Sequence, residues 1–136
     1  MTQIRKICHN LQPEIDSCIE YLLSNCNVKY NHTGVKGYIS DVRKGAAKID
    51  GRFTVPLWAY NKKYPEQDKK HNESFSAYFT YYVAHELAHI LRHNTYGLVG
   101  SHDFRYYEIF INLCPKHLQF FELDYIKTAG EYGVGK

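Results

Sequence analysis

The sequence HELAH at positions 85–89 lies within a segment that has the features of a long helix. No proline or glycine occurs between residues 72 and 94, and Asn72 or Ser74 can cap the N-terminus of such a helix. The apolar residues Phe75, Phe79, Tyr82, Val83, Leu87 and Ile90 recur within it at helical spacing. We therefore expect a long helix with one face against a hydrophobic core.

Two histidines of this run have the spacing of metal ligands. His85 and His89 are four residues apart, which on a helix places both on one face, about 6 Å apart along the axis. Glu86 is rotated by about 100° around the helix from His85, where its carboxylate can act on a water molecule without binding the metal. The pattern predicts a zinc ion held by the two histidines, with Glu86 as the general base of a hydrolase.

A catalytic zinc site needs a third protein ligand and one position open to water. His102 follows a glycine-bearing turn and begins the next expected helix, so the chain can double back and present it to the metal. Glu108, further along that helix, is the alternative, because a carboxylate also completes such sites. His93 lies eight residues after His85, about 12 Å along the axis, which is too far for a shared ion.

The remaining sequence predicts an α+β fold, in which a small antiparallel or mixed sheet packs on an N-terminal helix and on the HELAH helix. The N-terminal helix is expected from Pro13 to about Asn25, where apolar residues form one stripe. Short segments rich in β-branched and aromatic residues predict strands at 28–30, 37–41, 46–49 and 52–58, and two further helices are expected at 101–115, capped by Ser101, and 115–129.

Two features refine the expected sheet. The pair Asp50-Gly51 predicts a tight hairpin between the last two strands. Pro56 cannot donate to a sheet ladder, so the strand at 52–58 is expected at an edge, where it can pair with an extended peptide. A charged loop at 61–71 then leads into the HELAH helix.

Length and charge limit the classes of function. The 136 residues predict one domain over positions 1–130, followed by a flexible tail at 131–136. A net charge of +3 is too small to argue for nucleic-acid binding by itself. No segment has the length or apolar character of a signal peptide or a membrane span, so we expect a cytoplasmic protein without membrane contact. The four cysteines form no Cys-x-x-Cys pair, and we expect them as thiols.

Beyond HELAH, the sequence HELAHIL at 85–91 is followed by GSHDF at 100–104 and by Cys114-Pro115. With these motifs the segment from about 37 to 125 resembles the SprT-like metalloprotease family, which includes Spartan and the related YgjP-type peptidases. The resemblance implies a minimal zincin domain that binds Zn²⁺ and cleaves protein or peptide substrates, with His102 as the third ligand. Some members act on proteins trapped on DNA and carry a C-terminal zinc ribbon. No such ribbon follows here, so DNA is the weaker expectation for a partner.

We therefore expect a zinc metalloprotease in which Glu86 takes a proton from the attacking water and passes it to the leaving amine. A further donor is needed for the negative charge that develops on the carbonyl oxygen. Arg105, Tyr106, Tyr107 and Tyr125 are the candidates, and the sequence does not choose among them. The alternative function is a non-catalytic, zinc-containing module that binds protein or DNA. A metal closed by both His102 and Glu108 would favour that alternative.

Overall fold

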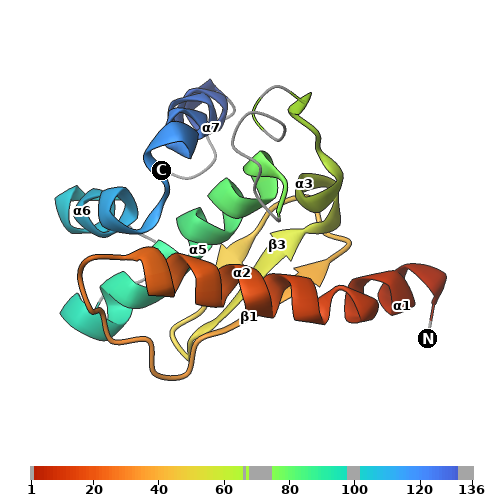
Figure 1. The fold of residues 1–136 in the computed structure, drawn as a ribbon, viewed down its shortest axis with the longest axis horizontal. Helices are drawn as coiled ribbons and strands as arrows, with labels where there is room; N and C mark the ends of the chain where they lie inside the picture. Colours follow the sequence, from red (N-terminus) through yellow and green to blue (C-terminus); the bar gives the residue numbers. More distant parts are fainter. Residues whose placement is uncertain (1, 66, 68–74, 98–101, 132–136) are drawn as a thin grey trace.

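The computed structural model describes residues 2–65, 67, 75–97 and 102–131. Helices pack with a small three-stranded sheet, so the expected α+β class is confirmed (Figure 1). In chain order the elements are α1 (Gln3–Asn10), α2 (Gln12–Asn25), β1 (Lys36–Ser40), β2 (Ala46–Ala47), β3 (Arg52–Pro56), α3 (Leu57–Asn61), α5 (Ala77–Tyr96), α6 (Phe104–Leu113), the short 3₁₀-helix η1 (Lys116–Leu118) and α7 (Phe120–Glu131).

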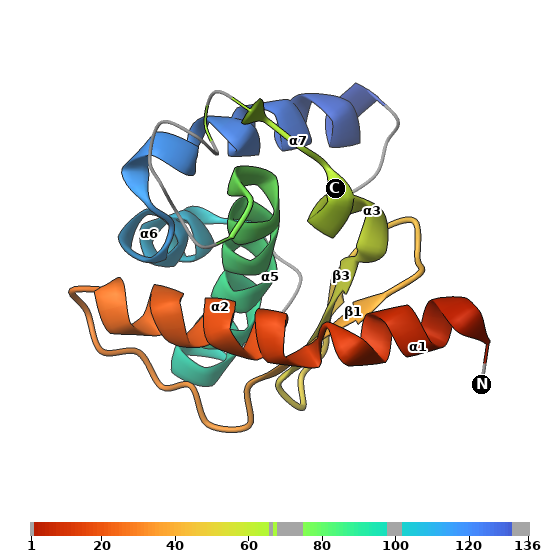
Figure 2. The same cartoon turned by 45° about the vertical axis from the view of Figure 1, so that its right-hand side comes forward.

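Helix α2 begins as expected, with Pro13 in its first turn. Its buried stripe packs on β1, and Gly37 shows how closely the two approach. A Cβ atom at Gly37 would lie 2.9 Å from Cδ1 of Ile15 and 3.0 Å from Cδ1 of Ile19. Helix α1, which the sequence pattern did not predict, precedes α2 end to end (Figures 1 and 2) and is capped by Thr2, whose side chain accepts a hydrogen bond from the Arg5 N–H.

The sheet is mixed, with strand order β1-β3-β2. Strand β3 pairs in parallel with β1 and antiparallel with β2. The expectation that the strand at 52–58 lies at an edge was therefore wrong, because β3 is central. Pro56 is tolerated because it occupies the last pair of the parallel ladder, opposite Ser40, and the chain turns directly into α3. The exposed edge next to α5 is β2 instead.

A hairpin is present between β2 and β3, as expected, but its loop is formed by the three residues 49–51 and not by the Asp50-Gly51 pair alone, because the Lys48 N–H donates to the Arg52 carbonyl. Gly51 has a φ of 96°, and a Cβ atom there would lie 2.3 Å from the carbonyl oxygen of Gly34. Only glycine fits this position, because a side chain would be strained and would also clash. The strand expected at 28–30 does not form. Tyr30 of that segment accepts a hydrogen bond from Asn112 Nδ2 at its hydroxyl instead, and Asn94 Nδ2 donates to the carbonyls of Asn31 and Thr33 just after it.

Helix α5 is the centre of the fold, with α2, α6, α7 and the sheet placed around it (Figure 2). Its residues from Ala77 to Arg92 are buried apart from Tyr78, which is half-buried, and this explains the apolar pattern of its sequence. Ser76 is its N-cap residue, while the expected caps Asn72 and Ser74 lie outside the described residues. Gly97, with a φ of 86°, ends it. Among the described residues, no helix combines the length and apolar character needed to span a membrane.

Candidate metal centre

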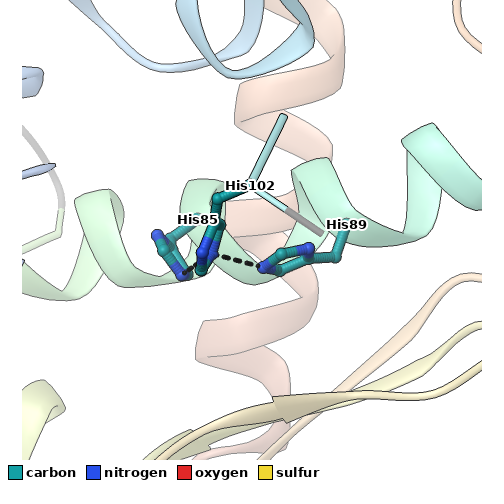
Figure 3. Close-up of side chains that lie close together, drawn as sticks. All are labelled: His85, His89 and His102. Atoms are coloured by element: carbon teal, nitrogen blue, oxygen red, sulfur yellow. Dashed lines mark hydrogen bonds between the residues drawn. The ribbon is translucent and has the colours of Figure 1, made fainter. Parts of the chain in front are cut away.

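Helix α5 presents His85 and His89 on one face, and the segment that enters α6 brings His102 onto them (Figure 3). Nε2 of His102 lies 3.0 Å from Nε2 of His89 and 3.3 Å from Nε2 of His85. One nitrogen from each ring lies within 4.8 Å of the other two. The structure therefore brings together the three histidines predicted from the sequence as metal ligands. Each points its Nε2 atom toward the other two.

This geometry fits a metal ion. Tetrahedral zinc with nitrogen bonds of about 2.0–2.1 Å holds its ligand nitrogens about 3.3 Å apart, close to the separations in the cluster. Burial lowers the pKa of His85 to about 3 and that of His89 to about 2, so both rings are neutral and keep a lone pair for a metal. Three imidazole nitrogens suit several transition metals, zinc among them.

A buried carboxylate orients His85. Oε1 of Glu122, on α7, lies 2.7 Å from Nδ1 of His85 and accepts a hydrogen bond of 3.0 Å from the Tyr81 hydroxyl. When Nδ1 donates its proton to Glu122, Nε2 carries the lone pair and faces the other two histidines. No sequence pattern marks Glu122 as part of the site, because a lone glutamate on a helix usually faces solvent.

His102 is fixed by the residue that follows it. Asp103 caps α6 by accepting from the Tyr106 N–H at 3.0 Å, and its carboxylate also pairs with the Arg92 guanidinium through both oxygens. Arg92 belongs to α5, one turn beyond His89, so this pair ties the start of α6 to the helix that carries the other two histidines. The Arg92 and Tyr106 hydrogen bonds hold the pKa of Asp103 well below its usual range.

Tyr106 completes the packing of the cluster. Its hydroxyl donates to the backbone carbonyl of His85 at 2.9 Å, and its ring lies 4.4 Å from that of His89 and 4.9 Å from that of His102, measured between centroids. The Tyr106 side chain is fully buried. It therefore sets the spacing between α5 and α6 at the level of the histidines.

Glu86 is buried beside the cluster, on the side of the sheet edge. A Cβ atom at Gly45 would lie 3.1 Å from Oε2 of Glu86, so the backbone just before β2 runs against this carboxyl group. Burial raises the pKa of Glu86 to about 8, Lys44 acts in the opposite direction, and Glu122 adds to the rise. A carboxyl group with such a pKa can exchange protons near neutral pH.

The two other ligand candidates lie apart from the cluster. Glu108 is exposed on α6, and its charge acts on Tyr30 on the far side of that helix. His93 is in the last turn of α5, where its carbonyl accepts from the Gly97 N–H. Within the described part of the chain, neither belongs to the group of side chains that could hold a metal ion.

The structure narrows the candidates for the oxyanion donor. The Tyr106 hydroxyl is already bonded to a backbone carbonyl, and Arg105 lies over the ring of Tyr96, where its guanidinium donates to the Tyr96 hydroxyl. Tyr125 of α7 remains closest to the cluster, with its ring centroid 4.3 Å from that of His85. Its ring is half-buried, and burial, with a contribution from the charge of Glu86, raises the pKa of its hydroxyl to about 12. Tyr107 is further out, 6.3 Å from the His102 ring.

Comparison of the chain with protein-family models, with curated proteins and with solved structures gave no match.

Proposed function

We propose that this protein is a zinc-dependent peptidase. The observation that carries the proposal is the convergence of three imidazole nitrogens, those of His85, His89 and His102, together with the buried carboxyl group of Glu86, the residue that follows His85. Three nitrogen ligands with one open position are the usual arrangement of catalytic zinc, whereas structural zinc is closed by four protein ligands.

The metal ion and the side chains of the protein would contribute different parts of the reaction. A bound zinc ion would supply a Lewis acid that polarises a carbonyl oxygen and lowers the pKa of a water molecule. Glu86 takes the proton from the attacking water as the water oxygen bonds to the carbonyl carbon. When the carbon–nitrogen bond breaks, Glu86 gives that proton to the leaving amine.

Two residues of α7 support these steps. Glu122 accepts the Nδ1 proton of His85 and so keeps Nε2 free to bind the metal. Tyr125, whose ring lies against His85, would donate its hydroxyl proton in a hydrogen bond to the carbonyl oxygen as negative charge develops there. In the described residues the Tyr125 hydroxyl makes no other hydrogen bond.

A peptide is the favoured substrate because of the sheet edge. Strand β2 pairs with β3 on one side and is the outer strand of the sheet on the other. The backbone that enters β2 runs against Glu86 at Gly45. An extended peptide that adds to this edge by main-chain hydrogen bonds would bring its own carbonyl groups to the site.

The residues at the start of α6 also support the proposal that the protein belongs to the SprT-like family. A third histidine at the start of a helix, followed within a turn by the aromatic residues Phe104 and Tyr106, is the SprT-like pattern that the sequence resembles. A fourth protein ligand that excludes water would favour the non-catalytic alternative. Glu108, the residue considered for that role, is exposed and outside the histidine cluster, so this alternative lacks support from the geometry.

The experiment that tests the proposal combines two measurements on one preparation. Elemental analysis of the purified protein should find one zinc per chain, and the same sample should cleave an unfolded protein, with or without added DNA. His102→Ala, which removes one nitrogen ligand, should lose both zinc and cleavage. Tightly bound zinc without cleavage under either condition would favour the binding module, and absence of zinc would remove the metal site.

A further inference from the structure

A second group of side chains has the chemistry of a binding site. Trp58, Tyr64 and Tyr78 surround the ammonium group of Lys62, and we call these three rings the aromatic cage. Nζ of Lys62 lies 4.7 Å from the ring centroid of Tyr78, 5.5 Å from that of Tyr64 and 5.8 Å from that of Trp58. An ammonium within about 6 Å of a ring centroid is attracted by the negative face of the ring.

The rings of the aromatic cage are held in place by other contacts, whereas the Lys62 side chain is not. Trp58 Nε1 donates to the carbonyl of Arg43 at 2.9 Å, and the ring centroids of Trp58 and Tyr64 each lie 5.7 Å from that of Tyr78. Lys62 is exposed just after α3 and, in the described part of the chain, makes no ion pair with a carboxylate. Another cation can therefore replace Lys62 while the rings keep their positions.

The cage is open to a ligand, and two carboxyl groups of α7 act on one of its rings. Trp58 is 44% exposed even with Lys62 over it. Burial is the main cause that raises the pKa of the Tyr78 hydroxyl, but the charges of Asp124 and Glu122 contribute to the rise. These carboxylates are near enough to attract a cation to the same rings.

The cage is also continuous with the candidate metal centre. The Trp58 ring meets Tyr82 edge-on at 6.0 Å, and the Tyr82 hydroxyl accepts from the Gly45 N–H beside Glu86. Tyr78 precedes His85 by two turns of α5, about 10 Å along the axis. An extended peptide advances about 3.3 Å per residue, so about three residues would span the two sites.

We propose that the aromatic cage binds a lysine or arginine side chain of the polypeptide substrate, about three residues from the bond that is cleaved, and that Lys62 fills the cage when substrate is absent. This inference rests on the proposed peptidase function. It adds a preference for basic residues that the metal centre alone does not supply.

The test uses peptides that bind the metal and are not cleaved. Two series of capped pentapeptides are used, one with a hydroxamate group at the N-terminal end and one with it at the C-terminal end. Within each series a single lysine is placed at each position in turn. A matching peptide with norleucine at that position is the uncharged control. Calorimetry on the zinc-loaded protein should show that lysine binds about three- to tenfold more tightly than norleucine at one position near the third residue. Trp58 is the only tryptophan of the chain, so its emission reports occupancy of the cage.

Variants separate the cage from general charge effects. Lys62→Ala empties the cage and should increase the preference for lysine, whereas Lys63→Ala, which removes a neighbouring charge, should leave it unchanged. Trp58→Leu should abolish the preference for lysine. If Trp58→Leu does not fold, Tyr64→Leu serves as the test variant in its place, with the same expected result. Equal binding of lysine and norleucine at every position, in both wild type and Lys62→Ala, would overturn the inference. If even the norleucine peptides fail to bind, the metal site is wrong and the inference falls with it.

Discussion

Glu122 Oε1 lies 2.7 Å from Nδ1 of His85, and this contact joins the last helix of the chain to the candidate metal centre. Both side chains are buried, and the Tyr81 hydroxyl donates to the same carboxylate oxygen. A histidine that donates one ring proton to a carboxylate binds metal through its other nitrogen, with a fixed orientation and greater basicity. We therefore expect the docking of α7 to be coupled to the affinity of this site for a metal.

Replacing Glu122 should weaken metal binding. We expect Glu122→Ala to lower zinc affinity by about 10- to 100-fold, because His85 loses its hydrogen-bond acceptor. Glu122→Gln keeps an oxygen that can accept from Nδ1 and should recover most of the loss. Zinc affinity is measured by competition with a chromogenic chelator. Equal affinity in wild type and Glu122→Ala would show that the contact serves packing only.

His102 and Glu108 should behave differently when each is changed to alanine. His102→Ala removes one of the three converging nitrogens and should leave the protein without stoichiometric zinc. Glu108→Ala changes an exposed carboxylate and should retain zinc and activity. The comparison is made by elemental analysis after dialysis. Loss of zinc in Glu108→Ala with retention in His102→Ala would reverse the assignment.

Removing the hydroxyl of Tyr125 should reduce turnover without affecting metal binding. Loss of one oxyanion donor costs about 10²- to 10³-fold in kcat, so Tyr125→Phe should fall in this range while KM stays near the wild-type value. Tyr107→Phe, at the next aromatic position outward from His102, is the matched control and should change kcat little. A kcat in Tyr125→Phe equal to that of wild type would exclude the donor role.

The buried carboxyl group of Glu86 makes the stability of the metal-free protein depend on pH. Its pKa is raised from 4.5 to about 8, so the folded state binds this proton more tightly than the unfolded chain does. The stabilisation is complete below pH 4.5 and is lost as pH rises towards 8. Glu86→Gln lacks this titration, so its free energy of unfolding relative to wild type should increase across this interval. Urea denaturation at several pH values measures the difference. A difference that does not change with pH would contradict the buried environment assigned to Glu86.

The sequence predicted those parts of the structure that depend on local spacing. The helix that carries His85 and His89 follows from apolar periodicity, and the approach of His102 follows from a break that lets the chain reverse. The contact between Glu122 and His85 could not be predicted this way, because it joins residues 37 positions apart and depends on how α7 docks. The pairing of Arg92 with Asp103 is equally a product of tertiary packing.

The position of β3 shows a different limit. Pro56 has no backbone N–H to donate, and the sequence therefore favoured an edge position for its strand. The missing donor is tolerated equally well at the end of a central strand, which is where Pro56 lies. Sequence alone does not distinguish these cases, since the answer depends on where β1 pairs. The same dependence explains the segment at 28–30, whose β-branched and aromatic residues indicate a strand although no partner strand is placed beside them.

The central claim is that Glu86 acts as the general base of a zinc peptidase, and Glu86→Gln tests it most directly. The glutamine has nearly the same shape but cannot accept the proton of the attacking water. Zinc content and cleavage of an unfolded protein should be measured on one sample of this variant and on wild type. We predict one zinc per chain in both proteins and cleavage by wild type alone. Cleavage by Glu86→Gln at the wild-type rate would contradict the assignment.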